Sequence, residues 1–420
     1  MKNSQKIGFL GALLLIVSCS TKKDAFLNRN YNALTTQYNI LYNGGVAFNE
    51  GLQEINASYE DDFFELLPIE PLTFKNKKFR LPKLSSSSSN KPGKGFQESP
   101  EQEESLTPFD IAEQKAVKAI QKHSMNIYGN ERNKKIDDAY LLLGKSRYYT
   151  ERFIPAIDAY NYIIANYPNA SLINETKIWR AKAHIRIENE ELAIETMEIL
   201  LRKPELPDFI REEANTTLAM AYTKMDSVQR VRKYLWEATK TSKNTIQKAR
   251  NLFVLGQLYG LDKIKDTASM VFQKLINFKP APYKYKIYAA IELAKNSVSD
   301  SSSTAILERY RKLIKNRDNR PYLDGVYYQV AVLEQERDSI NDAILNYNKS
   351  LRAVNGGAKQ KTYSYEKLAN LYFKDLDYVT AGAYYDSILQ VAKNKQTLRI
   401  KRIERRAKNL KSLTKYEEIL

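Results

Sequence analysis

Residues 139–168 read AYLLLGKSRYYTERFIPAIDAYNYIIANYP, and this stretch decides the fold. Its apolar side chains recur every three or four residues, which predicts two consecutive helices. Gly144 in the first helix and Ala156 in the second are small enough for the two backbones to approach closely. Tyr140 and Tyr160 can then fill the groove between the helices. The stretch therefore predicts a closely packed helical pair.

The same pattern returns along the chain. The small or apolar position of the second helix falls at residues 156, 193, 231, 268, 306, 343 and 381, at intervals of 37 or 38 residues. Such regularity indicates internal repeats rather than an irregular bundle. The order of an aromatic residue, Leu-Gly, Ala, an aromatic residue and Pro resembles the tetratricopeptide repeat. Because that repeat usually has about 34 residues, we expect an extra helical turn or a longer loop in each unit.

The predicted fold is all-α, a tetratricopeptide-like helical-hairpin solenoid preceded by a short N-terminal helical hairpin. In that hairpin, one helical face carries Tyr31, Leu34, Tyr38, Leu41 and Tyr42. We expect Gly44-Gly45 to break the first helix and Val46 to Ile55 to begin the second.

The predicted organisation has five parts. They are a signal peptide (1–18), a lipid anchor with the helical hairpin (19–74), a flexible basic and acidic linker (75–106), a solenoid of about seven repeats (107–391), and the basic start of a further, truncated repeat (392–420). An eighth small position would fall near 418–419, with its first helix near 398–411. We therefore expect the natural protein to continue beyond Leu420.

The first residues resemble the leader of a bacterial lipoprotein. Lys2 and Lys6 precede an apolar run that is too short to span a bilayer, and Ile16-Val17-Ser18-Cys19 resembles a lipobox. Cys19 is the only cysteine, and it stands where its thiol would accept a diacylglycerol and its freed amine a fatty acid such as palmitate. Ser20 in place of Asp, and no acidic run after it, favour the periplasmic face of the outer membrane.

Two windows together carry +16 of the formal charge of +17. Residues 75–94 carry +7 and residues 392–415 carry +9, so the chain is not uniformly basic. The first window belongs to a Ser-, Gly- and Pro-rich stretch that predicts a solvated linker, with docking to anionic headgroups or an acidic partner as the alternative. In the second, Lys401, Arg402, Arg405 and Arg406 are candidate partner-binding residues or one face of an internal helix. Neither window has a nucleic-acid-binding signature.

No catalytic motif stands out, and we expect a protein that is not an enzyme. Leu143-Gly144-Lys145-Ser146 lacks the earlier Gly of a phosphate-binding loop, and one Cys with two His excludes Cys- or His-rich metal sites. His123 and His184 are interpreted as structural, and Trp179 and Trp236 as core residues. Glu60-Asp61-Asp62 lacks the pattern of a calcium loop and is interpreted as a solvated acidic stretch.

Residues 30–44, NYNALTTQYNILYNG, and 115–125, KAVKAIQKHSM, resemble the PorW/SprE lipoproteins of the Bacteroidetes type IX secretion system. The resemblance continues through 139–149 and 152–156, and beyond about residue 200 only the repeat architecture matches. It implies a longer periplasmic scaffold that links translocon and motor or ring components by protein–protein binding, in secretion and gliding motility. No cofactor beyond the lipid, no nucleic acid and no small-molecule substrate is expected. The alternatives are a scaffold of another outer-membrane assembly machine, such as a barrel-assembly lipoprotein, or a SusD-like glycan-binding lipoprotein.

Overall fold

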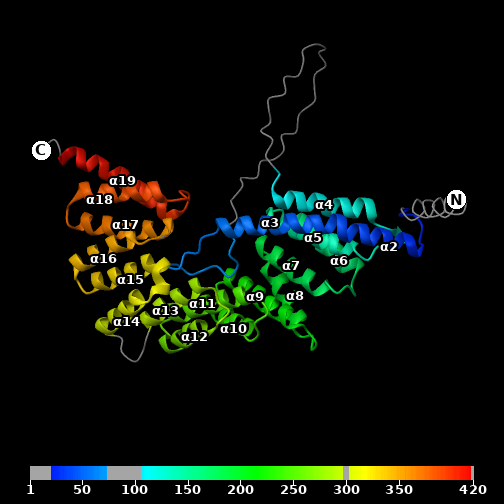
Figure 1. The fold of residues 1–420 in the computed structure, drawn as a ribbon, viewed down its shortest axis with the longest axis horizontal. Coiled ribbons are helices and arrows are strands. Elements are labelled where there is room, and N and C mark those ends of the chain that lie inside the picture. Colours follow the sequence, from blue (N-terminus) through cyan, green and yellow to red (C-terminus); the bar gives the residue numbers. More distant parts are fainter. Residues whose placement is uncertain (1–19, 73–105, 297–301, 355, 418–420) are drawn as a thin grey trace, which may run out of the picture. The chain divides into compact units, whose positions relative to one another are not determined.

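The computed structural model describes residues 20–72, 106–296, 302–354 and 356–417 (Figure 1). The chain forms two compact units. Unit 1 contains Met1–Tyr59 and Glu70–Ser227, and unit 2 contains Glu60–Ile69 and Val228–Leu420. The segment 60–69 therefore belongs to the second unit, although the sequence placed it in a separate N-terminal unit.

Both units consist of helices that pack against their neighbours in the chain. In unit 1 the repeat helices are α5 (Ile136–Tyr149), α6 (Phe153–Asn166), α7 (Ile173–Arg186), α8 (Glu190–Leu201) and α9 (Asp208–Lys224). In unit 2 they are α10 (Val228–Ala238), α11 (Thr245–Leu261), α12 (Lys265–Asn277), α13 (Tyr283–Asn296), α14 (Ser303–Lys315), α15 (Leu323–Glu336), α16 (Ile340–Arg352), α17 (Ala358–Lys374), α18 (Tyr378–Val391) and α19 (Leu398–Glu417), with a 3₁₀ turn η2 (Arg317–Tyr322) before α15. The all-α prediction is confirmed.

The repeat pattern matches the helices closely. Each of the seven predicted small or apolar positions is the fourth residue of a helix, in α6, α8, α10, α12, α14, α16 and α18. Six of the seven are buried; Ile306 is half-buried, and its neighbour Leu307 enters the core instead. The longer pitch comes from connections such as 167–172 and from first helices of 17 residues in α9, α11 and α17.

The turn before these helices also repeats. A residue with left-handed backbone stands two positions before each of α6, α8, α10, α12, α16 and α18, and these residues are Glu151, Glu188, Asp226, Lys263, Asp338 and Leu376. The amide that follows each of them donates to a carbonyl in the last turn of the preceding helix, as Arg152 N does to Arg147 O at 2.8 Å. This pattern satisfies helix-end carbonyls without requiring glycine.

Small residues allow aromatic rings to enter between paired helices. Tyr160 of α6 is fully buried against Gly144 of α5, where a Cβ would lie 2.3 Å from the ring. Phe272 of α12 lies in the same way against Gly256 of α11, at 2.5 Å. The predicted role of Gly144 is confirmed. Tyr140 instead stacks on Tyr162, with ring centroids 4.0 Å apart.

The helix break predicted at Gly44-Gly45 is wrong. Helix α2 (Phe26–Thr35), a π-helical segment η1 (Thr36–Leu41) and α3 (Tyr42–Ser58) follow one another without interruption (Figure 1). The partner of this long helix is α4 (Pro108–His123), which begins with a Thr107 capping box. Gly44 allows close contact with Leu142 and Lys115. It therefore serves packing rather than a turn.

The predicted apolar face of this helix does not form its core. The residues that face α4 and α5 are instead Asn28, Asn32, Thr36, Ile40 and Gly44, spaced by four. In an ideal α-helix each step of four overshoots a full turn by about 40°. The wider π-helical turn at 36–41 takes up this excess and keeps one face toward the partner helices.

A small polar network accompanies the apolar contacts of Ile40 on that face. Asn32 Oδ1 lies 2.9 Å from His123 Nδ1, and Asn133 Nδ2 donates to Thr36 Oγ1 at 3.0 Å. Burial and the charge of Lys118 lower the pKa of His123, which favours a neutral ring. After α4, β1 (Asn126–Ile127) and β2 (Asn130–Glu131) pair antiparallel across a turn with Tyr128 and Gly129 at positive φ.

The helix predicted near 398–411 is present as α19. Ile400, Ile403, Ala407 and Leu410 pack it against α18. The predicted linker lies outside the described residues except at 106. Among the described helices, none combines the length and the apolar character that crossing a membrane requires.

We predict that Gly45→Ala stabilises unit 1. Apart from its two chain neighbours and the adjacent backbone of its own helix, no atom lies within 4 Å of the position its Cβ would take, and Ala is favoured over Gly inside a helix by about 1 kcal/mol. Gly44→Ala is the matched control, because its Cβ would lie 2.8 Å from Leu142 Cδ2, which offsets the gain. Urea unfolding followed by circular dichroism measures both. Destabilisation by Gly45→Ala would contradict a continuous helix.

Candidate functional site

The candidate site is the surface of unit 2 on which the non-helical segment Glu60–Ile69 lies. The sequence of this segment is EDDFFELLPI, and the side chains that contact it come from α11, α13, α15 and α17. These are the first helices of four successive hairpins, as the repeat order defines them. We call this surface the inner groove.

Two phenylalanines fasten the segment to the inner groove. Phe63 stacks on Tyr288 with ring centroids 3.9 Å apart and an interplanar angle of 5°, and it meets Phe253 edge-on at 5.1 Å. Phe64 packs edge-on to Tyr328 at 4.9 Å. Phe63 is only 8% exposed. Since buried aromatic rings supply most of the apolar area at such contacts, these two residues are the main anchors.

A buried charge cluster holds the acidic end. The carboxylate of Asp61 pairs with Arg250, and Lys284 Nζ lies 2.8 Å from Asp61 Oδ2. The side chains of Asp61 and Arg250 are 2% and 3% exposed. Burial alone would raise the pKa of Asp61, but the two cations and their hydrogen bonds outweigh it and lower this pKa below its ordinary value of 3.8.

The groove also contacts the main chain of the segment. Gln257 Nε2 donates to Glu65 O at 2.8 Å, and Leu67 N donates to Gln257 Oε1 at 3.0 Å. Arg250 Nη1 donates to Pro68 O at 2.9 Å, and Lys359 Nζ donates to Glu60 O at 2.7 Å. Such contacts satisfy the backbone of a non-helical chain in the way that peptide-binding surfaces do.

The interpretation of Glu60-Asp61-Asp62 as a solvated stretch is wrong. Asp61 is buried, and Asp62 Oδ2 accepts a hydrogen bond from Tyr363 Oη at 2.8 Å. One signal could have suggested the groove: Gln247, Arg250 and Gln257 recur at three- and seven-residue spacing within α11. Sequence alone gave no means of matching that polar face to an acidic segment 190 residues away.

Unit 1 holds Glu70 in a related way. Its carboxylate pairs with Arg186 of α7 and accepts a hydrogen bond from Tyr148 Oη of α5 at 2.7 Å. Lys182 Nζ lies 2.7 Å from Glu213 Oε1 and 4.7 Å from the centre of the Trp179 ring. Burial and the Glu70 charge raise the pKa of Tyr148, so the phenol stays protonated and donates.

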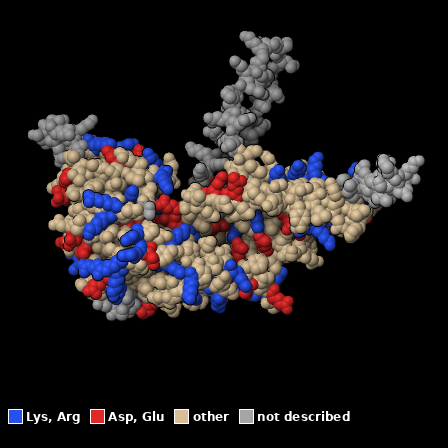
Figure 2. All heavy atoms as spheres, in the orientation of Figure 1, with Lys and Arg blue, Asp and Glu red and all other residues tan. Residues whose placement is uncertain are grey.

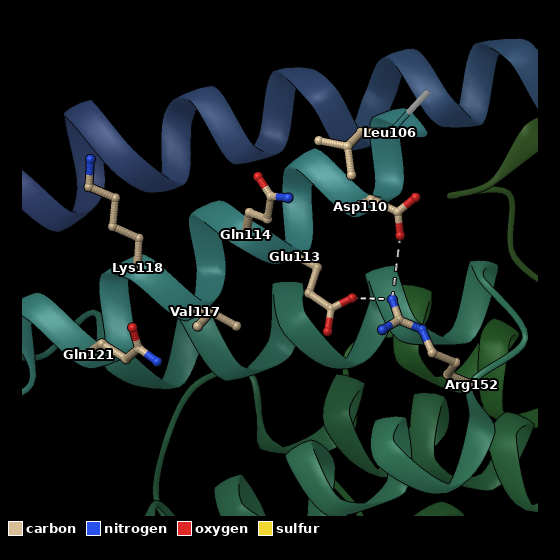
Figure 3. Close-up of a pocket in the computed structure, with 8 residues that line it drawn as sticks. All are labelled: Leu106, Asp110, Glu113, Gln114, Val117, Lys118, Gln121 and Arg152. Atoms are coloured by element: carbon tan, nitrogen blue, oxygen red, sulfur yellow. Dashed lines mark hydrogen bonds and ion pairs between the residues drawn. The ribbon is translucent and has the colours of Figure 1, made fainter. Parts of the chain in front are cut away.

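A shallow hollow of about 410 Å³ lies beside α4 (Figure 3). Its lining residues are Leu106, Asp110, Glu113, Gln114, Val117, Lys118, Gln121 and Arg152. Arg152 pairs with Asp110 and Glu113, and Glu113 also accepts from Arg147 Nε at 2.9 Å. These carboxylates are therefore engaged in ion pairs between helices. Across the described ranges, no cluster of three or more His, Cys, Asp or Glu is placed to hold a metal ion.

The four predicted partner-binding cations lie on α19, outside the groove contacts described above. Cys19 falls outside the described residues. Lys401, Arg402, Arg405 and Arg406 occupy exposed positions on α19, and Figure 2 shows basic side chains along this helix. Arg406 Nη1 lies 3.3 Å from Asn370 Oδ1. Trp179 belongs to the core of unit 1.

Comparisons with known proteins give likeness in fold only. No protein-family model and no curated protein matches the chain. Among solved structures, the human IFIT1 dimer with PPP-AAAA is 14% identical over 72% of this chain and 68% of that chain, with a TM-score of 0.38. The Cut9–Hcn1 structure is 12% identical over 71% and 52%, with a TM-score of 0.35. The TPR2AB domain of yeast Sti1 in its pHSP90 complex is 17% identical over 66% and 97%, with a TM-score of 0.25.

The class of the protein follows from its own helices. Helix pairs at intervals of 37 or 38 residues, with a small or apolar residue at the fourth position of the second helix and recurrent left-handed turns, define a tetratricopeptide-type helical repeat protein.

We predict that Asp61→Asn destabilises unit 2 by about 3–5 kcal/mol, because Arg250 stays buried without its carboxylate partner. The lowered pKa means that the native carboxylate contributes stability above pH 3.8, which is lost as the pH falls through the folded-state pKa. The Asp61→Asn variant should therefore lack the part of the fall in stability at acid pH that comes from protonation of Asp61. Urea unfolding between pH 3 and pH 7, in the range where carboxylates titrate, measures both effects.

Asp386→Asn is the control for this experiment. Its carboxylate pairs with Lys411 at 3.1 Å, and the side chains of Lys411 and Asp386 are 64% and 40% exposed. Its removal should therefore change the stability by about 0–1 kcal/mol. Equal effects of the two substitutions would contradict a structural role for the Asp61 cluster.

Proposed function

We propose that this protein is an outer-membrane-anchored periplasmic scaffold lipoprotein that binds segments of partner proteins along its first helices. The observation that carries the proposal is the occupied inner groove of unit 2. It holds a non-helical decapeptide by stacked rings, buried charges and main-chain hydrogen bonds together. A surface that meets all three requirements of a non-helical chain is suited to binding proteins.

The assignment to a particular machine rests on the sequence. The lipobox ending at Cys19, and the resemblance of residues 30–44 and 115–125 to the PorW/SprE lipoproteins, support a place in the type IX secretion system. The scaffold would then link translocon components to the motor or ring components, in secretion and gliding motility. The lipid on Cys19 would anchor it in the outer membrane, and Ser20 with no acidic run after it favours the periplasmic face.

The test is affinity purification of the full-length lipoprotein from native membranes after crosslinking. We predict recovery of type IX translocon and ring proteins. Charge reversal at Lys401, Arg402 and Arg405 should lower that recovery roughly tenfold if the exposed basic face of α19 contributes to binding. Its thermal unfolding should stay unchanged, because these side chains point away from the buried face of the helix.

The matched control reverses Arg311, Lys312 and Lys315 on α14. These are three exposed cations of the same unit, and their reversal should leave the recovery intact. Recovery of barrel-assembly proteins or glycan transporters without any type IX component would contradict the assignment. An equal loss in both variants would show a general charge effect and would remove α19 from the proposal.

Anchoring is tested separately at Cys19. We predict that Cys19→Ala moves the protein from the outer-membrane fraction to the soluble periplasmic fraction, because stable anchoring needs more than one acyl chain and the variant would carry none. Fractionation followed by immunoblotting measures the distribution, with a resident outer-membrane barrel as the marker. Unchanged retention in the membrane fraction would refute the lipid anchor.

A further inference from the structure

An aromatic stripe runs along the exposed side of the long helix in unit 1. It consists of Leu27, Tyr31, Leu34, Tyr38, Tyr42 and Val46, with exposed fractions of 52%, 38%, 56%, 62%, 66% and 51%. Phe26, 78% exposed, stands at its beginning. From Leu27 to Val46 the helix extends roughly 28 Å at its ordinary rise. An exposed apolar surface of this length marks a site where something else packs.

The opposite side of this helix is already occupied. Asn28, Asn32, Thr36 and Ile40 are buried, and the helix contacts α4 and α5. Because the π-helical segment keeps that buried face turned inward, it keeps the stripe turned outward along the whole length. Figure 2 shows the surface over α2 and α3 as predominantly neither acidic nor basic. The stripe is therefore a continuous face and not a set of scattered residues.

The polar side chains beside the stripe are few, and several of them already form hydrogen bonds or ion pairs within the protein. No Asp or Glu occurs between residues 25 and 49. Asn30 Nδ2 donates to Phe26 O at 2.9 Å, and Asn43 Nδ2 donates to Asn39 O, so these exposed amides bond to their own helix. Arg29 pairs with Asp24 at 2.5 Å. Burying such a face therefore breaks few hydrogen bonds to water. The face also has no acidic side chain that would repel anionic headgroups.

We propose that the aromatic stripe lies against the membrane surface, with its rings at the level of the lipid headgroups. This inference rests on the lipid anchor of the proposed function. Phe26 follows Cys19 by seven residues, a distance that a fully extended chain spans in at most about 25 Å. Tyrosine is enriched at membrane–water interfaces because its ring is apolar and its hydroxyl is polar, and half of the stripe is tyrosine. Exposed Lys118 and Lys122, on the neighbouring α4, add positive charge toward anionic lipid.

The chain's only cysteine allows a test that does not need cellular lipidation. The mature chain, beginning at Cys19, is coupled through that thiol to maleimide-bearing lipid in vesicles of phosphatidylethanolamine and phosphatidylglycerol. Tyr38→Trp reports contact through a blue shift and through quenching by brominated lipid. The matched control is Leu345→Trp, at a residue on α16 of unit 2 that is 52% exposed. The parent chain supplies the background of the two native tryptophans.

The expected result is quenching of Trp at position 38 and none at position 345. Adding Leu34→Glu and Tyr42→Glu should reduce the quenching about tenfold, because burying each charge is unfavourable. Equal quenching at both positions, or none at position 38, would overturn the proposal. A blue shift at position 38 that does not change when vesicles are added would also overturn it. Such a result would mean that a second copy of the chain, or the chain's own residues 73–105, covers this position. Because the tether is chemical, these outcomes are independent of whether Cys19→Ala releases the protein in cells.

Discussion

The close approach of paired helices at small side chains governs the architecture of both units. Because Gly144 and Gly256 have no side chain, the rings of Tyr160 and Phe272 pack directly against the backbone of the paired helix. The pairing in turn fixes which side of each first helix faces its partner and which side remains for other contacts. The inner groove is built from those remaining sides, so its geometry follows from packing that lies elsewhere in the same hairpins.

The groove shows how an acidic segment becomes part of a folded unit. Asp61 is removed from water only because Arg250 and Lys284 lie beside it, and Arg250 also donates to the main chain at Pro68. A buried carboxylate with one cation fewer would be costly. The stacked rings of Phe63 and Tyr288 exclude water from the same place. Charge and apolar contact therefore support one another, and a partner segment in such a groove would need both.

The long N-terminal helix follows a different rule. In its first half the buried residues Asn28, Asn32 and Thr36 are polar, and Asn32 and Thr36 join a hydrogen-bond network with His123 and Asn133, while Tyr31, Leu34 and Tyr38 remain exposed. This reverses the usual order of an amphipathic helix on a soluble protein. The reversal is consistent with a helix that has two environments, a specific polar contact with its own unit and an apolar contact with another surface.

The sequence by itself determined the helical repeats, because their packing needs small and aromatic residues at fixed spacing, and that spacing is visible in one chain. It determined the beginning of α19 for the same reason. Only the tertiary structure decided that Gly44-Gly45 lies inside a helix and that Asp61 is buried. A π-helical turn changes the register by an amount that residue patterns do not encode. Likewise, the burial of Asp61 depends on Arg250 and Lys284, which lie 189 and 223 residues away in the chain and whose positions only the folded molecule defines.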